Sequence, residues 1–501
     1  MHLPCRIVQV MLVSVLFLGA CADEVSESLR FGMSADPVTL DPRFATDAAS
    51  TRVNRLLYAR MVDFDEKFEP VPSLAGWEIV SPRLYRFTLG SAMRRFHNGA
   101  QLQAKDVKAT YDSVLDPATA SPHRAGLDMI ESISVRDERT VDFKLVRPDP
   151  LFPGRLVVGI LPEAGIAREH AFNRAAIGSG RFEFVDWRSD GNLRIRRLVD
   201  GQMLEFVRVP QPQPTVRVLK LLRGELDMLQ GDLPTELVQW LLKRGDVRVQ
   251  KQRGTNFAYL GFNLEDPVVG ELRVRNAIAH AIDREAIIHF VMGGAARPAS
   301  AILTPDHWAG NPQLKALSYD PERAIALLRE LGYGPENPVR IVYKTSSDPF
   351  RVRLATILQE QLGRVGIQVD LRSYDWGTFY ADVKAGRFQM YSLAWVGIKM
   401  PDIFKYALHS TSVPPSGANR GRFSSKVADK LMDQAENADS LSVQAGYYRQ
   451  LQKYLLEELP YVPLWYEDYV FASRDDIVGY SLGRDGNYDG LVKVRREATR
   501  P

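Results

Sequence analysis

Two short segments in the second half of the chain carry the side chains best suited to binding chemistry. One is Trp395-Val396-Gly397-Ile398-Lys399, and the other is Asn419-Arg420-Gly421-Arg422-Phe423. A tryptophan offers a flat apolar surface, and two neighbouring arginines could hold one carboxylate in a bidentate manner. The same residues also fit a core tryptophan and a solvated charged loop. We expect an organic ligand here, and the candidate contacts are Trp395, Val396, Gly397, Lys399, Asn419, Arg420 and Arg422.

Motifs for catalysis or metal binding are scarce in this sequence. The eight histidines are scattered, and no His-Glu-x-x-His, Cys/His cluster, Gly-x-Ser-x-Gly or Gly-x-x-x-x-Gly-Lys pattern occurs. Carboxylate pairs leave no linear signature, so a hydrolase remains an alternative. The sequence favours a binding protein that is not an enzyme and has no metal site and no cofactor.

The elements that must position the two segments alternate between helix and strand. Asp320-Pro321-Glu322 is typical of a helix start, and apolar residues recur at helical spacing up to Gly332. Strands are expected at 339–343, 367–371 and 388–395, with helices at about 352–365 and 379–384. This order predicts a parallel pair with a right-handed crossover. Trp395 then lies at the carboxyl end of a strand, where open α/β sheets bind ligands.

The first half of the chain predicts a smaller α+β unit. Residues 84–89 read as a strand, and apolar residues alternate again from Val141 to Leu145. Between them, one helical face carries apolar side chains, namely Val107, Tyr111, Val114 and Leu115.

The first 21 residues have the anatomy of a secretory signal. Arg6 precedes an apolar run, Ile7 to Leu18, which is too short to span a bilayer. Leu18-Gly19-Ala20-Cys21 then resembles the lipobox of bacterial lipoproteins, in which the cysteine receives lipid and begins the mature protein. An ordinary cleavage site beside a cysteine is the alternative. We expect a periplasmic or otherwise extracytoplasmic body, attached to a bacterial membrane through lipid on Cys21.

Composition limits what the mature chain can be. The 480 residues after Cys21 (501 minus 21) are too many for one hydrophobic core, so two or three lobes are expected. Lys+Arg 64 against Asp+Glu 61, with no basic block, argues against a nucleic-acid partner. Cys5 and Cys21 are the only cysteines, so no thiol remains for a disulfide or a metal. No apolar run after Leu18 is long enough to cross a membrane. We also expect the protein to be a monomer.

Eight further motifs follow one another along nearly the whole mature length. They are Leu40-Asp41-Pro42; Pro70-Val71-Pro72-Ser73-Leu74-Ala75; Phe96-His97-Asn98-Gly99 with Ala104-Lys105-Asp106-Val107; Gly178-Ser179-Gly180-Arg181-Phe182; Leu222-Arg223-Gly224-Glu225-Leu226-Asp227; Tyr259-Leu260-Gly261-Phe262-Asn263; Arg273-Val274-Arg275-Asn276-Ala277-Ile278; and Ala281-Ile282-Asp283-Arg284. In this order and spacing they resemble the extracytoplasmic solute-binding proteins of ABC importers, family 5, the oligopeptide/dipeptide/nickel-binding group. Most of these residues are expected to be scaffold; Val274, Ile278 and Ile282, for example, share a core-facing helix side whose charges face outward.

The resemblance implies an α/β fold of the periplasmic-binding-protein kind. It is a two-lobed clamshell of type II, the large peptide-binding class, with an inserted α+β subdomain. The expected divisions are 1–21 for the signal peptide, 22–62 plus 177–257 plus 467–501 for lobe I, 63–176 for the inserted subdomain and 258–466 for lobe II. The chain would cross between the lobes near Tyr259 and Pro463-Leu464-Trp465-Tyr466, and Ser34 of lobe I is a further candidate ligand contact.

The resemblance also implies a function. Such a protein captures peptides or a similar small solute and delivers them to a membrane permease with its ATPase subunits. The alternatives are a receptor of the same fold for a metal chelate, haem or an oligosaccharide, and a ligand-sensing lipoprotein without transport.

One position departs from the family pattern. Three residues after the tryptophan, the family has an aspartate that pairs with a peptide's free amine, whereas this chain has Ile398 and then Lys399. We therefore expect an electropositive cleft in which Lys399, Arg420 and Arg422 favour a ligand carboxylate over its amine.

Overall fold

The computed structural model describes residues 28–497 apart from 34, 91–93, 210–213 and 232. The signal segment, Cys21 and Ser34 lie outside these described residues. Within them, no helix combines the length and the apolar character needed to cross a membrane.

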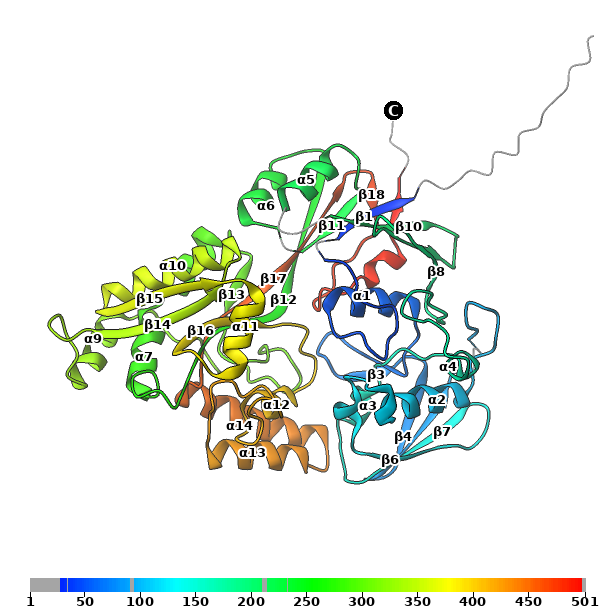
Figure 1. Ribbon diagram of the computed structural model, residues 1–501, viewed down its shortest axis with the longest axis horizontal. Coiled ribbons are helices and arrows are strands. Elements are labelled where there is room, and N and C mark those ends of the chain that lie inside the picture. Colours follow the sequence, from blue (N-terminus) through cyan, green and yellow to red (C-terminus); the bar gives the residue numbers. More distant parts are fainter. Residues whose placement is uncertain (1–27, 34, 91–93, 210–213, 232, 498–501) are drawn as a thin grey trace, which may run out of the picture.

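One mixed sheet runs through both halves of the molecule (Figure 1). Its strands, in spatial order, are β15 (Ile367–Tyr374), β14 (Val339–Ser346), β16 (Met390–Trp395), β12 (Val247–Phe262), β17 (Tyr461–Arg474), β11 (Met228–Gln230), β1 (Leu29–Met33), β10 (Met203–Arg208), β9 (Leu193–Arg197) and β8 (Phe182–Trp187), with β13 (Ala296–Pro298) beside β17. The long strands β12 and β17 are antiparallel neighbours at its centre and join the two halves.

The crossing between the halves lies where β12 and β17 lose regular pairing. Residues Val247 to Gln252 of β12 pair with the end of β17 that lies beside β11, whereas Asn256 to Gly261 pair with its start. The register shifts between Gln252 and Asn256. These positions are a few residues from the crossings expected near Tyr259 and Pro463–Tyr466. A break in a ladder is where a strand pair can bend.

The half that contains Trp395 is an α/β layer arrangement, as expected. Its helices are α7 (Leu272–Ala281), α8 (Arg284–Ala286), a π-helical turn (Ile287–Val291), α9 (Pro321–Glu330), α10 (Pro349–Arg364), α11 (Trp376–Ala385), α12 (Ile403–Leu408), α13 (Lys426–Glu436) and α14 (Leu441–Glu458). β14 and β15 are parallel and joined by α10, so the predicted crossover unit is confirmed. The Asp320 side chain accepts a hydrogen bond from the Arg323 N–H and caps α9, as its position predicted.

The other half divides into a sheet-bearing part and an α+β unit. The first adds α1 (Ala48–Leu57), α5 (Pro214–Leu222), α6 (Thr235–Leu242), β18 (Ile477–Val478), a 3₁₀ turn (Asp489–Val492) and β19 (Arg495–Arg496). The second contains β2 (Val62–Phe64), β3 (Pro70–Pro72), β4 (Ala75–Ser81), β5 (Leu84–Leu89), α2 (Ala104–Leu115), 3₁₀ turns (Pro117–Thr119 and Arg124–Leu127), β6 (Ile130–Val135), β7 (Thr140–Leu145), α3 (Phe152–Arg155) and α4 (Glu163–Ala167). Its sheet β4-β5-β7-β6 and helix α2 confirm the elements expected there.

Separate hydrophobic clusters lie within the parts expected as lobes. One occupies residues 59–160, and a second combines residues 29–58, 161–228 and 469–494. Two more lie between residues 257 and 466. Leu151 belongs to one of these last clusters, so the α+β unit packs directly on the opposite half. The residue limits of the lobes stay predictions.

The helix α7 differs from expectation in where its charges lie. The apolar face is buried as predicted, but Arg275 and the following Arg284 are buried too. Arg275 donates to the carbonyl of Leu459 at 2.9 Å, and Arg284 donates to that of Pro463 at 2.8 Å. Burial lowers the pKa of each to about 10. The carbonyls of Leu459, just before β17, and of Pro463, within it, thus accept hydrogen bonds from these two buried guanidinium groups, which helical periodicity alone did not show.

Candidate functional site

Three parallel strands end at one edge of the sheet. β14 pairs in parallel with both β15 and β16, so Ser346, Tyr374 and Trp395 end their strands on the same side. The antiparallel β12 places Phe257 opposite Trp395. Figure 1 shows α11 and α12, which follow this edge, on the side that faces α1 and β3 of the other half. This is the edge where open α/β sheets bind ligands.

Trp395 is one layer of a stack of planar side chains at this edge. The rings of Trp376 and Tyr380, both on α11, are 5.3 Å apart and 8° from parallel. The guanidinium carbon of Arg420 lies 5.4 Å from the Tyr380 ring centre and 4.9 Å from that of Trp395. Beyond Trp395 comes Tyr259, at 6.4 Å and 14°. The stack holds the guanidinium between two aromatic faces by cation–π attraction.

Arg420 has hydroxyl partners but no acidic one. Only 7% of the residue is exposed. It donates to the hydroxyls of Tyr380 at 3.1 Å and Tyr259 at 3.3 Å. Within the described part of the chain, no carboxylate oxygen lies within 4.0 Å of its nitrogens. Burial lowers the pKa of Arg420, but the surrounding tyrosines outweigh this and raise it above its ordinary value, so the group is cationic.

The other two candidates from this segment point elsewhere. Arg422 has a left-handed backbone, with φ of 56°, and its Nε lies 3.5 Å from a Glu265 oxygen. Its guanidinium also donates to the carbonyl of Ala385 at 3.3 Å. The buried Asn419 amide donates to the carbonyls of His409 and Phe423 and so shapes the turn. Arg420 and Arg422 therefore do not converge on one point as a pair.

The segment after Trp395 reaches the opposite half. Val396 is exposed, and Gly397 has a φ of +72°, a left-handed turn that favours glycine. The ammonium of Lys399 lies 2.6 Å from an oxygen of Asp485, with 20% and 18% of the two side chains exposed. Burial raises the pKa of Asp485, but Lys399 and Arg55 outweigh it and hold that pKa below its usual range. The candidate Lys399 is thus neutralised by a carboxylate of the other half.

Further contacts accompany Lys399 across the junction of the two halves. Arg155 of the α+β unit pairs with Asp402 at 2.8 Å, and Arg484 pairs with Asp306. The backbone N–H of Trp308 donates to the carbonyl of Lys67 at 3.1 Å. The structure therefore holds the halves in contact. Sequence reasoning missed Tyr380, Asp485 and His307, because nothing in the local pattern indicates which distant residue a side chain meets.

His307 is buried at this junction in a neutral form. Its ring stacks on Phe68 at 5.7 Å. Its Nδ1 accepts from the Ala309 N–H at 3.0 Å, which leaves Nε2 to donate to the Lys399 carbonyl at 3.1 Å. Burial is the main cause that lowers the pKa of His307 to about 4.

Acid should destabilise the protein through His307. Between pH 6.5 and about 4 the unfolded chain binds a proton that the folded ring refuses, so stability is full above pH 6.5 and falls as the pH drops through this window. The loss approaches about 3 kcal/mol for a shift of this size. Urea midpoints measured from pH 7 to pH 4 should fall more steeply for the wild type than for His307→Gln. Parallel slopes would show that His307 is not the group responsible.

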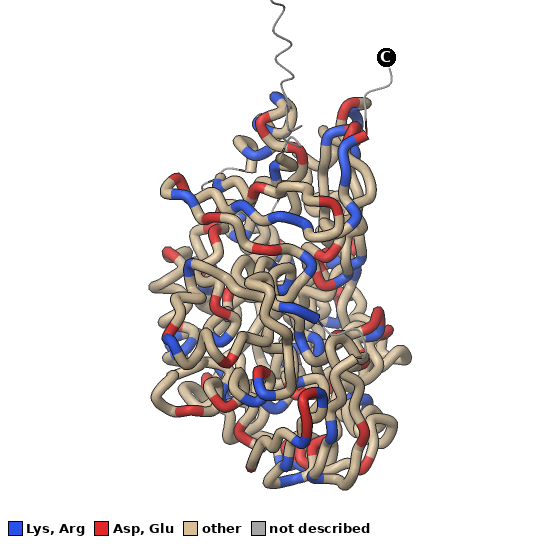
Figure 2. The backbone as a smooth tube through the Cα atoms, turned by 90° about the vertical axis from the view of Figure 1, so that its right-hand side faces the viewer, with Lys and Arg blue, Asp and Glu red and all other residues tan. Residues whose placement is uncertain are grey.

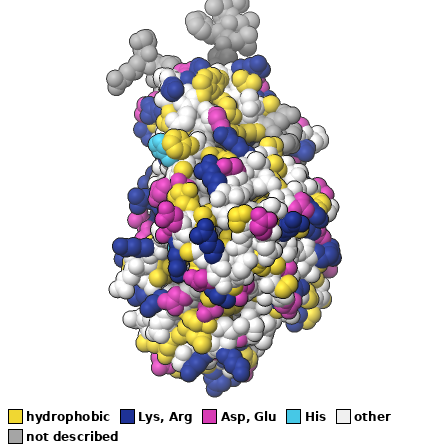
Figure 3. Space-filling view, turned by 90° about the vertical axis from the view of Figure 1, so that its left-hand side faces the viewer, with side chains coloured by type: hydrophobic (Ala, Val, Ile, Leu, Met, Phe, Trp, Pro, Cys, Tyr) yellow, Lys and Arg dark blue, Asp and Glu magenta, His cyan; other side chains and the backbone are white. Residues whose placement is uncertain are grey.

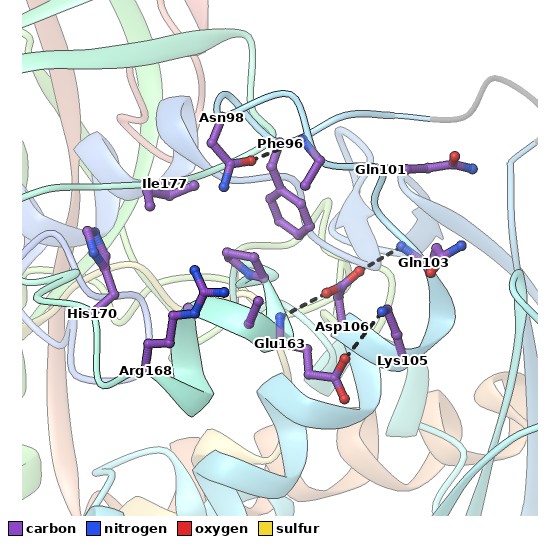
Figure 4. Close-up of a pocket in the computed structure, with 14 residues that line it drawn as sticks. Phe96, Asn98, Gln101, Gln103, Lys105, Asp106, Glu163, Arg168, His170 and Ile177 are labelled. Atoms are coloured by element: carbon purple, nitrogen blue, oxygen red, sulfur yellow. Dashed lines mark hydrogen bonds and ion pairs between the residues drawn. The ribbon is translucent and has the colours of Figure 1, made fainter.

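A pocket of about 430 Å³ lies away from this edge, between the start of α2 and α4 (Figure 4). Asp106 points into the scaffold there, since its carboxylate accepts from the N–H groups of Gln103 and Glu163, each at 2.8 Å. Lys105 lies 3.4 Å from the Glu163 carboxylate. Asp106 therefore caps α2 and fastens α4 to it, which gives the family-like motif here a structural role.

Charged side chains are dispersed over the rest of the described chain and form no concentrated patch in the two views. Figure 2 shows basic and acidic residues interspersed along the backbone, and Figure 3 shows charged and hydrophobic side chains mixed on another face. No group of three or more His, Cys, Asp or Glu side chains among the described residues could hold a metal ion.

Known proteins match this chain over most of its length. Residues 69–415 match the family described as "Bacterial extracellular solute-binding proteins, family 5 Middle". The dipeptide-binding protein of Escherichia coli K12 is 24% identical over 95% of this chain and 96% of its own. Di/tripeptide-binding protein 2 of Pseudomonas aeruginosa UCBPP-PA14 is 27% identical over 90% and 93%.

Solved structures share the fold. NikZ of Campylobacter jejuni, in complex with Ni(L-His), has a TM-score of 0.80 at 22% identity and covers 94% of this chain and 100% of its own. A dipeptide binding protein from Pseudoalteromonas sp. SM9913, in complex with Met-Leu, has a TM-score of 0.78 at 25% identity, with the same coverage. The two-lobed α/β clamshell that the sequence predicted is thereby confirmed. The chain belongs to the bacterial extracellular solute-binding proteins of family 5.

Proposed function

We propose that this protein is the ligand-binding subunit of an ABC importer. It captures peptides, or a similar small solute, outside the cytoplasmic membrane and hands them to a permease driven by ATPase subunits; it is not itself an enzyme. The observation that carries the proposal is the match, over 90% and 95% of this chain, to relatives named as a di/tripeptide-binding and a dipeptide-binding protein.

The ligand would bind between the lobes, at the edge where β14, β15 and β16 end. Trp395, Val396 and Gly397 would contact it from lobe II, because Trp395 is half-buried at the end of β16 and the next two residues are exposed where the chain leaves this edge. Ser34 is a proposed contact from lobe I. Asn419 and Arg422 would act indirectly, by holding the turn that carries Arg420.

Closure of the lobes around the ligand would couple binding to delivery. The two strands β12 and β17 are the joints, and their irregular pairing permits a bend. In solution without ligand the lobes would separate, and ligand contacts made only in the closed arrangement would supply the free energy that closes them.

Calorimetry combined with small-angle scattering tests this function. A mixed pool of dipeptides should give saturable binding to the purified protein, and the radius of gyration should fall in the same titration. Trp395→Ala should weaken binding at least tenfold, whereas Trp240→Ala, a change of an exposed tryptophan on α6, should not. Binding of a metal chelate or another non-peptide solute in place of every dipeptide, read by mass spectrometry of ligand released from the purified protein, would contradict a peptide receptor.

The proposed anchor is lipid on Cys21, which keeps the receptor beside its permease. Cys21→Ser removes the thiol that accepts the lipid, so the protein should lose metabolic labelling by palmitate and leave the membrane fraction or remain unprocessed. Cys5→Ser is the matched control and should change neither property. A Cys21→Ser protein that still fractionates with membranes would show that the anchor lies elsewhere.

A further inference from the structure

We propose that Arg420 is the anion-binding residue of this receptor, so that it selects ligands by a carboxylate rather than by a free amine. This inference rests on the proposed function, since it specifies which group of the ligand the inter-lobe site reads. It concerns a position where the chain differs from the amine-capturing pattern of the group that its sequence resembles.

The charge of Arg420 has no acidic partner among the described residues. A guanidinium that is nine-tenths buried needs a counter-charge or a full set of acceptors, because burial removes its hydration. Among the described residues, the Arg420 guanidinium donates to two tyrosine hydroxyls and contacts two aromatic faces, but it contacts no carboxylate. An anionic group of a ligand would supply the missing charge, and a planar carboxylate matches the geometry of the guanidinium fork.

Arg420 lies at the edge of the sheet where the ligand is proposed to bind. Its guanidinium is between Tyr380 of α11 and Trp395 of β16, which both belong to the edge that faces the other lobe. Trp376 extends the same stack and is 59% exposed. The aromatic faces hold the guanidinium in one orientation before any ligand arrives, so little side-chain entropy is lost on binding.

Two carboxylates at the junction of the two halves, Asp402 and Asp485, are already paired with cations. Asp402 lies 2.8 Å from Arg155, and Asp485 lies 2.6 Å from Lys399. The position three residues after Trp395, which would carry the amine-binding aspartate, is Ile398. A ligand ammonium would have to displace an existing cation to reach either acid. A carboxylate faces no such competitor at Arg420.

The test is a comparison of one ligand in three chemical forms. A pool of dipeptides is offered as free acids, as C-terminal amides and as N-acetyl derivatives, and native mass spectrometry identifies what the purified protein binds. Calorimetry then measures the best binder in each form. We expect amidation to weaken binding about ten- to a hundredfold, as for loss of a charged hydrogen bond, and N-acetylation to change it less than about threefold. If only those C-terminal amides that contain Asp or Glu bind, the carboxylate that Arg420 recognises is on the side chain of the ligand rather than at its C-terminus.

Variants assign the effect to one residue. In Arg420→Met, which keeps an apolar chain within the stack, the acid and the amide should bind equally. Arg420→Lys should keep part of the preference. Arg364→Met is the matched control, since this exposed arginine at the end of α10 pairs with Glu360 of its own helix, and it should keep all of the preference. Thermal unfolding of each variant shows which variants are folded. Tyr380→Phe removes one hydroxyl partner of Arg420 but no charge, so this variant should also retain the preference for the acid.

The outcomes separate this inference from the proposed function. If dipeptides bind but Arg420→Met discriminates between acid and amide as the wild type does, or if N-acetylation is the costlier change, the inference is wrong and the peptide receptor stands. If no dipeptide binds but an acid released from the purified protein rebinds in an Arg420-dependent manner, the peptide function is wrong and the inference stands. If neither dipeptides nor a released acid bind, both are wrong.

Discussion

Lys399→Met should shift the two lobes towards an open arrangement. Lys399 follows β16 in one half of the molecule and Asp485 follows β18 in the other, so their 2.6 Å ion pair exists only while the two halves are in contact. Removing one partner of a buried pair leaves a carboxylate that burial disfavours, a penalty of about 3–5 kcal/mol. In an open arrangement water would hydrate Asp485, so the penalty falls on the closed state alone. Each 1.4 kcal/mol is about tenfold in the ratio of closed to open molecules.

Fluorescence energy transfer and small-angle scattering measure this shift. The expected mature chain has no cysteine after Cys21, so Val199→Cys, between β9 and β10, and Phe290→Cys, in the π-helical turn of the other half, provide unique label positions at exposed sites. At one dipeptide concentration that closes only part of the wild-type molecules, transfer efficiency should be lower and the radius of gyration larger in Lys399→Met. Adding Asp485→Asn removes the unpaired charge and should recover part of the closed population.

An exposed ion pair across the same junction provides the control. Arg353 of α10 pairs with Glu236 of α6, and both side chains are exposed. Such surface pairs contribute about 0–1 kcal/mol, so Arg353→Met should leave the distribution nearly unchanged. If Lys399→Met and Arg353→Met gave the same transfer efficiency as the wild type, the buried pair would not hold the lobes together.

Gly178→Ala should destabilise the protein by about 3 kcal/mol or more, at the upper end of what overpacking costs. A Cβ at this position would lie 1.9 Å from the carbonyl oxygen of Leu57, at the end of α1. That oxygen already accepts a hydrogen bond from the Gly180 N–H at 2.8 Å, and the Gly178 carbonyl accepts from the His97 N–H at 2.8 Å. Because the obstacle is backbone that is hydrogen-bonded on both sides, it cannot move aside without breaking this junction.

The urea midpoint of unfolding measures the effect, and Gly446→Ala is the matched control. Gly446 lies within α14, where an added Cβ meets nothing within 4 Å. Alanine is the better helix former by about 0.8–1.0 kcal/mol, so this second glycine-to-alanine change should stabilise the protein. Opposite signs for the two variants are expected. A Gly178→Ala protein as stable as the wild type would mean that α1 and this segment do not pack closely.

The sequence alone determined the elements and the fold class, because both depend on local pattern. Helix starts such as Asp320-Pro321, apolar periodicity and alternating strands act over a few residues, and the structure places α9, α10, β14, β15 and β16 where these patterns predicted. It also placed Trp395 at the end of its strand, since that follows from where the strand stops.

Only the tertiary structure decided which charges remain available to a ligand. Lys399, Arg420 and Arg422 are all candidate cations in the sequence. In the structure Lys399 pairs with Asp485, 86 residues away, and Arg422 lies beside Glu265. Arg420 instead lies between rings from α11 and β16. Likewise, helical periodicity places Arg275 on the surface. In the structure it is buried and donates a hydrogen bond to the Leu459 carbonyl, 184 residues away. Electrostatic partners are chosen by distance in space, and local sequence pattern does not encode that distance.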